Sequence, residues 1–294
     1  MSNKMAGLGK VFAIAGAALL IVGSATSAGA ATALSNQWKF DETTAGTNAA
    51  DAVGGNTAVP NGNPAPQPST DVPNNSPANA RSVQFDGQNW FDLNNPVSGD
   101  FSICAWIKTL STGGDQHYLG ANIIESEAGG FAYDWGFGIN SQGKLMFGNG
   151  GNLNGSDQDA NVMGVAVVAD NTWHEVCVTR NNTTGEDILY VDGHQDSTGF
   201  TGTALVTQNP QAHIGAGTDG AVHFVGNMDD IRIYQQVLPA EEVASHVTTD
   251  DVTYQNNVFL GNTGSNDGLL MLLGSLLLVL GVGSMTVARI KQKP

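Results

Sequence analysis

Residues 221–238, AVHFVGNMDDIRIYQQVL, contain a run from Phe224 to Tyr234 in which apolar side chains alternate with polar ones. This alternation is typical of a β-strand with one buried face. Similar runs occupy residues 82–93, 101–108, 137–139, 144–147, 174–180 and 188–192, and Gly, Asn and Asp turns separate them. Residues 34–247 are therefore expected to form one all-β domain, a two-sheet antiparallel sandwich.

Two segments depart from the strand pattern. Residues 60–77 hold six of the ten prolines, and proline donates no backbone hydrogen bond, so this segment is expected to be a long surface loop and not a central strand. Residues 239–247 begin with Pro239 and place Glu241 and Glu242 in a first turn. They predict one short closing helix.

The two ends of the chain have the composition of export and anchoring segments. Residues 1–33 carry Lys4 and Lys10, then an apolar run, and end in Ala-x-Ala sites, which predicts a signal peptide. Residues 268–288 contain no charge and are long enough to cross a bilayer as one transmembrane helix. The basic residues of 289–294 follow, so the positive-inside rule predicts that this tail is cytoplasmic and that the preceding domain lies outside the cell.

Residues 248–267 are polar and are expected to form a stalk. They include Leu260-Gly261-Asn262-Thr263-Gly264, which resembles the Leu-Pro-x-Thr-Gly signal that sortases cleave, with Gly261 in the place of the proline. Covalent attachment to a cell wall and a plain membrane anchor both stay open. Either one predicts an extracellular domain anchored to the cell surface.

The charge balance limits the partners. The whole chain has a formal net charge of −16, and residues 34–267 hold only six basic residues against all 27 acidic ones. Nucleic acid is excluded as a partner, because its phosphates would be repelled. Divalent cations are compatible with this surface, because carboxylate and carbonyl oxygens are the ligands that calcium prefers.

Six segments, in order along the chain, resemble one family. They are WKFDE at 38–42, SVQFDG at 82–87, FSICAWIK at 101–108, TWHEVCV at 172–178, LYVDG at 189–193 and GNMDDIRIY at 226–234. Together they resemble the laminin-G-like jelly roll of the concanavalin A-like lectin and glucanase superfamily, which also contains the pentraxins. The resemblance implies a two-sheet jelly roll that binds ligands, carbohydrates among them.

The chain has two cysteines, and each lies in a predicted strand. Alternation leaves Cys104 and Cys177 on the less apolar faces of 101–108 and 174–180, as expected of cross-strand neighbours in one sheet. In an exported protein with two cysteines, a disulfide is the default prediction. The pentraxins are similar, since they carry and bridge a cysteine in each of these strands.

The resemblance also implies a structural calcium site. In many relatives such an ion ties the first strand to the last, and Asp41, Asp229 and Asp230 stand at the matching positions. Calcium needs six to eight oxygens, so carbonyls or water would complete its shell. The alternative is that Asp229 and Asp230 cap the turn into the strand while Asp41 is solvated.

Ligand-binding residues are expected in a Gly-, Asn- and Asp-rich segment and on an aromatic side chain. Asn152, Asp157 and Asp159 could bind calcium or the hydroxyl groups of a glycan, and a plain loop is the alternative. Trp135 could provide an aromatic platform for a sugar, and a packing role is equally open.

Catalysis has weaker support. The pair Glu125 and Glu127 has the spacing that places two carboxylates on one strand face, but the Glu-x-Asp-x-Glu pattern of the family's glycosidases is absent from the sequence. The six histidines are scattered, and no pair has the spacing of a zinc site. The sequence therefore predicts a non-catalytic recognition or adhesion module that binds a glycan or a surface protein. A glycoside hydrolase of the same fold and a purely structural surface-layer component are the alternatives, and the oligomeric state is not predicted.

Overall fold

The computed structural model describes residues 32–74, 79–127, 134–151, 159–207, 209–217 and 223–247. Nearly all of the predicted signal peptide, and the whole of the predicted stalk, membrane span and basic tail, lie outside these ranges. Across the part that is described, no helix combines the length and the apolar character that crossing a membrane would require.

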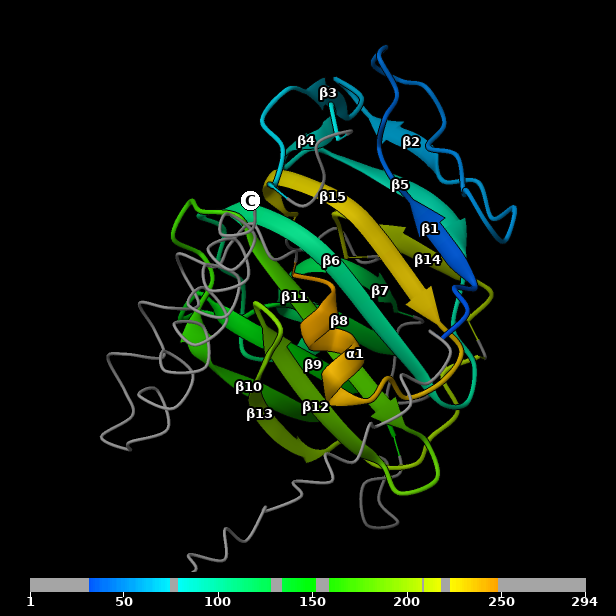
Figure 1. Cartoon of the computed structure of the whole chain (residues 1–294), viewed down its shortest axis with the longest axis vertical. Coiled ribbons are helices and arrows are strands. Elements are labelled where there is room, and N and C mark those ends of the chain that lie inside the picture. The colour runs from blue at the N-terminus through cyan, green and yellow to red at the C-terminus, as the bar shows by residue number, and fades with distance from the viewer. Residues whose placement is uncertain are drawn as a thin grey trace, which may run out of the picture. The chain divides into compact units, whose positions relative to one another are not determined.

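The described residues form two antiparallel β-sheets, which confirms the predicted all-β sandwich (Figure 1). The eight-stranded sheet runs in the order β13 (His194–Phe200), β12 (Glu186–Val191), β11 (His174–Asn181), β6 (Phe101–Thr109), β15 (Val225–Tyr234), β4 (Ser82–Asp86) and β3 (Gln67–Ser69), with β1 (Asn36–Trp38) also paired to β15. The seven-stranded sheet runs β10 (Ala160–Val167), β9 (Lys144–Asn149), β8 (Trp135–Ile139), β7 (Ala121–Ser126), β14 (Gln211–Ile214), β5 (Asn89–Asn94) and β2 (Val59–Gly62).

The main core lies between the two sheets and comes from the alternating apolar positions. Phe101, Ile103 and Ile107 of β6 are fully buried, as are Phe137 of β8 and Phe147 of β9. Successive side chains of a strand point to opposite faces, so the intervening residues lie on the outer face of each sheet. This alternation decides which side chains can meet a ligand.

A second, smaller core lies on the outer face of the eight-stranded sheet, beneath α1 (Ala240–Ser245). Val243 of α1 and Leu238 pack against Tyr190, Tyr234 and the two cysteines. Figure 1 shows α1 in orange, in front of the strands in this view. The predicted closing helix is confirmed, and Pro239 is its N-cap residue.

The proline-rich segment differs from its prediction. Within residues 60–77, which were expected to be one long loop, lie most of β2 and the whole of β3. Both are edge strands, β2 of the seven-stranded sheet and β3 of the eight-stranded one. Proline is tolerated at a sheet edge because one side of an edge strand needs no ladder hydrogen bonds.

Candidate functional site

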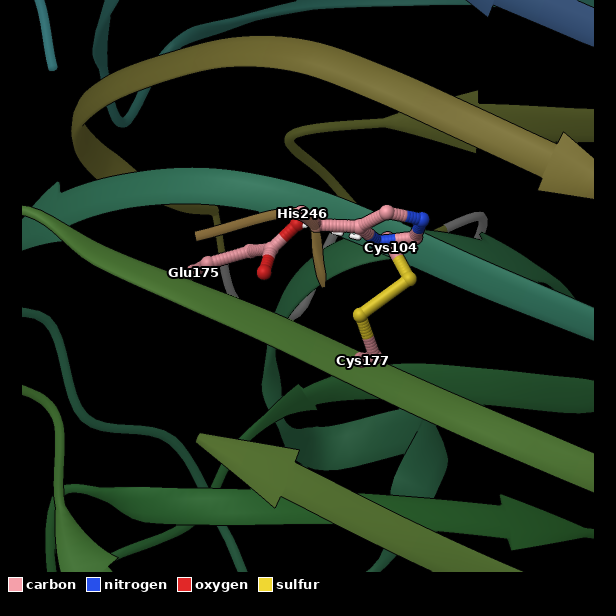
Figure 2. A group of neighbouring side chains, drawn as sticks. All are labelled: Cys104, Glu175, Cys177 and His246. Atoms are coloured by element: carbon pink, nitrogen blue, oxygen red, sulfur yellow. Dashed lines mark ion pairs between the residues drawn. A yellow bond between two sulfur atoms is a disulfide. The ribbon is translucent and has the colours of Figure 1, made fainter. Parts of the chain in front are cut away.

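The predicted disulfide joins Cys104 and Cys177 across neighbouring strands. The two residues are direct partners in the register between β6 and β11, and both side chains are buried. Figure 2 shows Glu175 and His246 beside the sulfur atoms. Because both sulfurs are bonded to each other, this group is a covalent link between strands and not a thiolate metal site.

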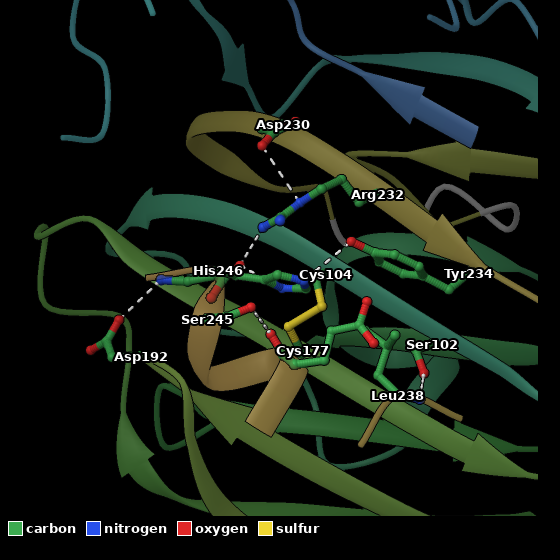
Figure 3. Close-up of a disulfide and its surroundings, with 12 residues drawn as sticks. Ser102, Cys104, Cys177, Asp192, Asp230, Arg232, Tyr234, Leu238, Ser245 and His246 are labelled. Carbon is green, nitrogen blue, oxygen red and sulfur yellow. Dashed lines mark hydrogen bonds and ion pairs between the residues drawn. A yellow bond between two sulfur atoms is a disulfide. The ribbon is translucent and has the colours of Figure 1, made fainter. Parts of the chain in front are cut away.

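An ion-pair network adjoins the disulfide. Arg232 of β15 lies between Glu175 of β11, to which its Nη2 donates, and Asp230, whose Oδ2 is 3.5 Å from its Nε (Figure 3). His246, just after α1, lies with Nδ1 at 3.2 Å from Oε1 of Glu175. Burial lowers the pKa of Arg232, but the negative charges of Glu175 and Asp230 outweigh it, so the net pKa is raised. These contacts link β15 and the residue after α1 to Glu175 of β11.

The three residues predicted to bind calcium lie in one region of the fold. Asp229 is buried and accepts a hydrogen bond from Asn79 Nδ2 at 2.6 Å, while Asp230 accepts one from Gln37 Nε2 at 2.6 Å. Burial raises the pKa of Asp229 to about 7; the bond from Asn79 opposes this rise, and the charges of Asp230 and Asp41 add to it. Asp230 also adopts a positive φ of 46° in an irregular part of β15. Both aspartates lie within β15 and accept from side chains of other segments, so neither caps a turn into the strand, and the calcium site stays a prediction.

Of the four predicted ligand-binding residues, the structure describes Trp135 and Asp159. Trp135 points inward from β8, has no exposed surface and packs against the ring of Phe101 at 6.0 Å, so its position fits the packing alternative. Asn152 and Asp157 lie outside the described residues. Asp159 is half-buried at the start of β10, close to His117 and Asp134.

An open cavity of about 480 Å³ lies on the outer face of the eight-stranded sheet, where β6 ends and β15 begins. We call it the β6–β15 pocket; its lining residues are Asp71, Gln84, Phe85, Lys108, Thr109, Leu110, Ser111, Asn171, Val225, Gly226 and Asn227. Gln84, Asn227 and Lys108 form one row across β4, β15 and β6. The cavity volume lies within the range of small-ligand sites, roughly 300 to 1,000 Å³.

The chemistry of the β6–β15 pocket is mixed. Asp71 is held at one side by Lys108 Nζ at 2.7 Å and by the indole Nε1 of Trp173 at 2.9 Å. The hydrogen bond from Lys108 lowers the pKa of Asp71, so this carboxylate is charged at neutral pH. Leu110 and Val225 line the same cavity with 68% and 50% of their surfaces exposed. The pocket thus offers donors, acceptors and an apolar contact surface together.

Sequence reasoning did not identify this pocket. Gln84, Lys108 and Asn227 are the polar, outward positions of predicted strands, which is the usual pattern of any solvated sheet face. What could have distinguished them is the strand order, since β4, β15 and β6 are neighbours only in the folded sheet. Their joint position was therefore not predictable from spacing.

Glu125 and Glu127, the residues considered for catalysis, lie at the end of β7. Glu125 is buried, opposite Gly136 on β8, and accepts a hydrogen bond from Asn122 of the same strand. Glu127 has its Oε2 at 3.9 Å from Nε2 of His117. The described contacts of both carboxylates are thus with neighbouring polar side chains.

Comparison with known proteins agrees with this fold. Residues 79–244 match the Laminin_G_3 family, described as the concanavalin A-like lectin/glucanases superfamily. Human pentraxin-4 is 32% identical over 88 residues, which are 27% of this chain and 18% of the human protein. The chain therefore corresponds to about a fifth of that relative's length.

Two solved structures share the architecture at low identity. Domain 4 of AbnA, an extracellular GH43 arabinanase from Geobacillus stearothermophilus solved with arabinotriose, aligns at a TM-score of 0.55 and 16% identity, over 74% of this chain and all of that domain. The binding domain of Paraclostridial mosquitocidal protein 1 aligns at 0.52 and 13%, over 72% of this chain and 51% of that one. With the family match spanning more than half of its residues, this chain belongs to the concanavalin A-like lectin/glucanase superfamily.

Proposed function

We propose that this chain is a non-catalytic recognition module that binds carbohydrate at the cell surface. The observation that carries the proposal is the β6–β15 pocket, which combines a charged carboxylate, amide groups and exposed apolar side chains in one cavity. Sugar sites use this combination, because hydroxyl groups need aimed donors and acceptors while the ring faces need apolar contact.

The groups in the pocket are suited to hydroxyl recognition. Gln84 is exposed and offers both an amide donor and a carbonyl acceptor, while Asp71 is an ionised acceptor held in place by two donors. Charge-assisted hydrogen bonds to a fixed carboxylate are about twice as strong as neutral ones. The chain is strongly acidic and would repel an anionic ligand. A neutral polyol therefore suits this cavity better.

The relatives add support of a general kind. The arabinanase domain with the same architecture was solved with a bound oligosaccharide, and the mosquitocidal domain is named a binding domain. Shared fold does not specify a ligand, so the sugar itself has to come from experiment. A protein ligand on the cell surface is the alternative outcome.

We also propose export and surface anchoring, with a signal peptide at 1–33, a polar stalk at 248–267, a membrane span at 268–288 and a cytoplasmic tail at 289–294. Their support is the charge and hydropathy of the sequence. The buried disulfide is consistent with an oxidising compartment. Sortase processing at 260–264 would replace the membrane anchor by a wall linkage.

Calcium binding at Asp41, Asp229 and Asp230 is a further part of the proposal. The negative charges of Asp230 and Asp41 add to the cost of ionising Asp229, and a divalent cation would relieve that repulsion. The ion would then tie the segment after β1 to β15.

A glycan-array screen of the purified full chain, in calcium and in chelator, tests the function. The proposal predicts specific binding that saturates and that the free sugar competes away. Turnover of a bound oligosaccharide would instead favour the hydrolase alternative, and a silent array from a folded, disulfide-bonded protein would contradict carbohydrate recognition. Loss of binding in chelator would make calcium part of the site.

A further inference from the structure

A histidine and two aspartates meet on the outer face of the seven-stranded sheet, at its β9 and β10 side. His117 begins the 3₁₀ turn η1 (His117–Leu119), Asp134 precedes β8 and Asp159 precedes β10. One ligating atom from each of the three lies within 4.8 Å of the other two. The three come from separate parts of the chain, so the sheet brings them together.

The histidine is buried without hydrogen-bond partners on its ring. The side chain of His117 is 1% exposed, and neither Nδ1 nor Nε2 makes a hydrogen bond within the described residues. Its nearest charged neighbour is Oδ1 of Asp134, at 3.4 Å from Nε2, beyond normal hydrogen-bond distance. A buried polar group is normally satisfied, so an imidazole in this state is a candidate ligand for a bound ion.

The two aspartates show the same pattern. Oδ1 of Asp134 and Oδ1 of Asp159 are both buried and form no hydrogen bond within the described residues. Burial raises the pKa of Asp159, the charge of His117 opposes that rise, and the charge of Asp134 adds to it. No lysine or arginine pairs with either aspartate among the described ion pairs.

The surrounding backbone is shaped to leave this space. Gly136 and Gly148 are direct partners on β8 and β9, and a Cβ on Gly148 would come within 2.6 Å of the His117 Cβ. A Cβ on Gly150 would lie 1.8 Å from Oδ1 of Asp134 and 3.3 Å from Oδ1 of Asp159. Glycines at these positions let the ring lie on the sheet and the carboxylates turn toward it.

The main chain holds His117 in place. Its backbone N–H donates to Oδ1 of Asn161 on β10 at 2.8 Å, and its carbonyl accepts from Nδ2 of Asn122 on β7 at 3.0 Å. These two bonds hold the His117 backbone between side chains of two different strands and use neither ring nitrogen. Within the described residues, both ring nitrogens are therefore available to a ligand.

We propose that His117, Asp134 and Asp159 form a binding site for a divalent transition metal of the zinc class. An imidazole nitrogen with two carboxylate oxygens is a donor set that zinc accepts, whereas calcium takes oxygen ligands only. Three protein ligands leave a fourth position for water, a carbonyl or Glu127, whose Oε2 lies 3.9 Å from Nε2 of His117. This site is separate from the proposed calcium site and does not depend on carbohydrate binding.

The test is a titration of the purified full chain with zinc, after chelator treatment and dialysis. Isothermal titration calorimetry measures the binding. Visible absorption of bound Co²⁺ reports the geometry of the same site. The wild-type chain should bind one zinc ion that millimolar calcium does not displace. Asp159→Asn, at the most exposed of the three ligands, should weaken zinc binding by at least about tenfold.

Two control variants make the result specific. Asp170→Asn removes a carboxylate that also lies beside a histidine, with Oδ1 at 3.2 Å from Nε2 of His174. Asp170 belongs to no three-ligand group of described residues, so this variant should leave zinc affinity unchanged. Asp229→Asn should do the same, which separates this metal from the proposed calcium. If the wild-type chain binds no zinc, or if Asp159→Asn binds it as tightly, the proposal is overturned and His117–Asp134 is only an ion pair. Near-ultraviolet circular dichroism checks that each variant is folded.

Discussion

At the scale of single residues, Asp51 ties the bend at residues 51–56 to β1. Its carboxylate accepts hydrogen bonds from the backbone N–H groups of Gln37, Val53, Gly54 and Asn56, and from the side chain of Asn36, at 2.7–3.0 Å. Burial would raise the pKa of Asp51, but these donors together lower it to about 2. The ionised form is therefore the one that the fold uses.

Replacing Asp51 by alanine leaves those donors without their acceptor. We expect Asp51→Ala to reduce the free energy of unfolding by about 2 kcal/mol at pH 7. A carboxyl group whose pKa is lower in the folded chain than in the unfolded chain stabilises the fold at pH values above its unfolded pKa of about 3.8. This contribution is lost as the pH falls toward 2. Urea unfolding of wild type and Asp51→Ala at pH 7 and pH 2.5 measures the difference in unfolding free energy. An equal difference at both pH values would contradict this account.

Asp229 should show the opposite pH dependence. Its pKa rises from about 3.8 in the unfolded chain to about 7 in the fold, so the folded state binds the extra proton between these values. Stability attributable to this group therefore falls as the pH rises from 4 to 7. Without calcium, Asp229→Asn should be more stable than wild type at pH 8, by on the order of 2 kcal/mol, and nearly equal to it at pH 4.

Thermal unfolding of both proteins at the two pH values, with and without calcium, tests this expectation. Asparagine keeps an acceptor for Asn79, so the variant changes the charge and little else. If calcium binds here, it should raise the melting temperature of wild type at pH 8 and leave that of Asp229→Asn unchanged. A difference between the two proteins that does not vary with pH would rule out the assigned pKa.

At the scale of elements, a buried ion pair joins β11 to β12. Arg180 and Asp187 are fully buried, with Nη1 of the arginine 3.0 Å from Oδ1 of the aspartate. The same guanidinium donates to Thr201 Oγ1 and to the carbonyl of Gly202, each at 2.7 Å, which fixes the segment after β13. This pair connects two strands and the loop that follows them.

Removing one partner should leave the other charge buried and uncompensated. We expect Asp187→Ala to cost about 3 to 5 kcal/mol of unfolding free energy, and Arg180→Met combined with Asp187→Leu to cost much less. Asp71→Ala, which breaks a surface pair with Lys108, serves as the control and should cost about 1 kcal/mol or less. Chemical denaturation measures the unfolding free energy of each variant. Equal losses of unfolding free energy in Asp187→Ala and Asp71→Ala would show that burial of an ion pair does not increase the cost of removing one partner.

The sequence predicted the strands in which apolar and polar residues alternate regularly along the chain. Alternation located β6, β11 and β15 within about two residues, and it placed Cys104 and Cys177 on the less apolar faces of their strands, where the structure pairs them. It failed at β2 and β3, where proline content suggested a loop, because edge position depends on sheet order and not on composition. The β6–β15 pocket and the His117 cluster were not found for the same reason: their residues meet only through strand pairing.

At the scale of the whole molecule, the disulfide closes a loop across the centre of the eight-stranded sheet. The two cysteines are 73 positions apart in the chain. In the chain-entropy model a crosslink of this span stabilises the fold by about 4 kcal/mol, by restricting the unfolded chain. We therefore expect Cys104→Ala with Cys177→Ala to lose stability of that order.

Guanidinium unfolding of the double variant and of oxidised wild type measures this loss. Wild type under reducing conditions should unfold close to the double variant, because the same crosslink is missing from both. A double variant as stable as the oxidised protein would mean that strand pairing and the core beneath α1 carry the stability unaided.

The central claim is that the outer face of the eight-stranded sheet binds carbohydrate at the β6–β15 pocket. The most direct test is equilibrium binding of a glycan selected on the array to wild type, to Gln84→Ala with Leu110→Ser, and to Val165→Ser. Leu110 and Val165 are each 68% exposed, but Val165 lies on β10 of the other sheet, so it is a matched control. We predict that the pocket variant binds at least about tenfold more weakly, a loss of about 1.4 kcal/mol, while Val165→Ser binds like wild type. Unchanged affinity in the pocket variant would contradict the claim and place the ligand elsewhere on the domain.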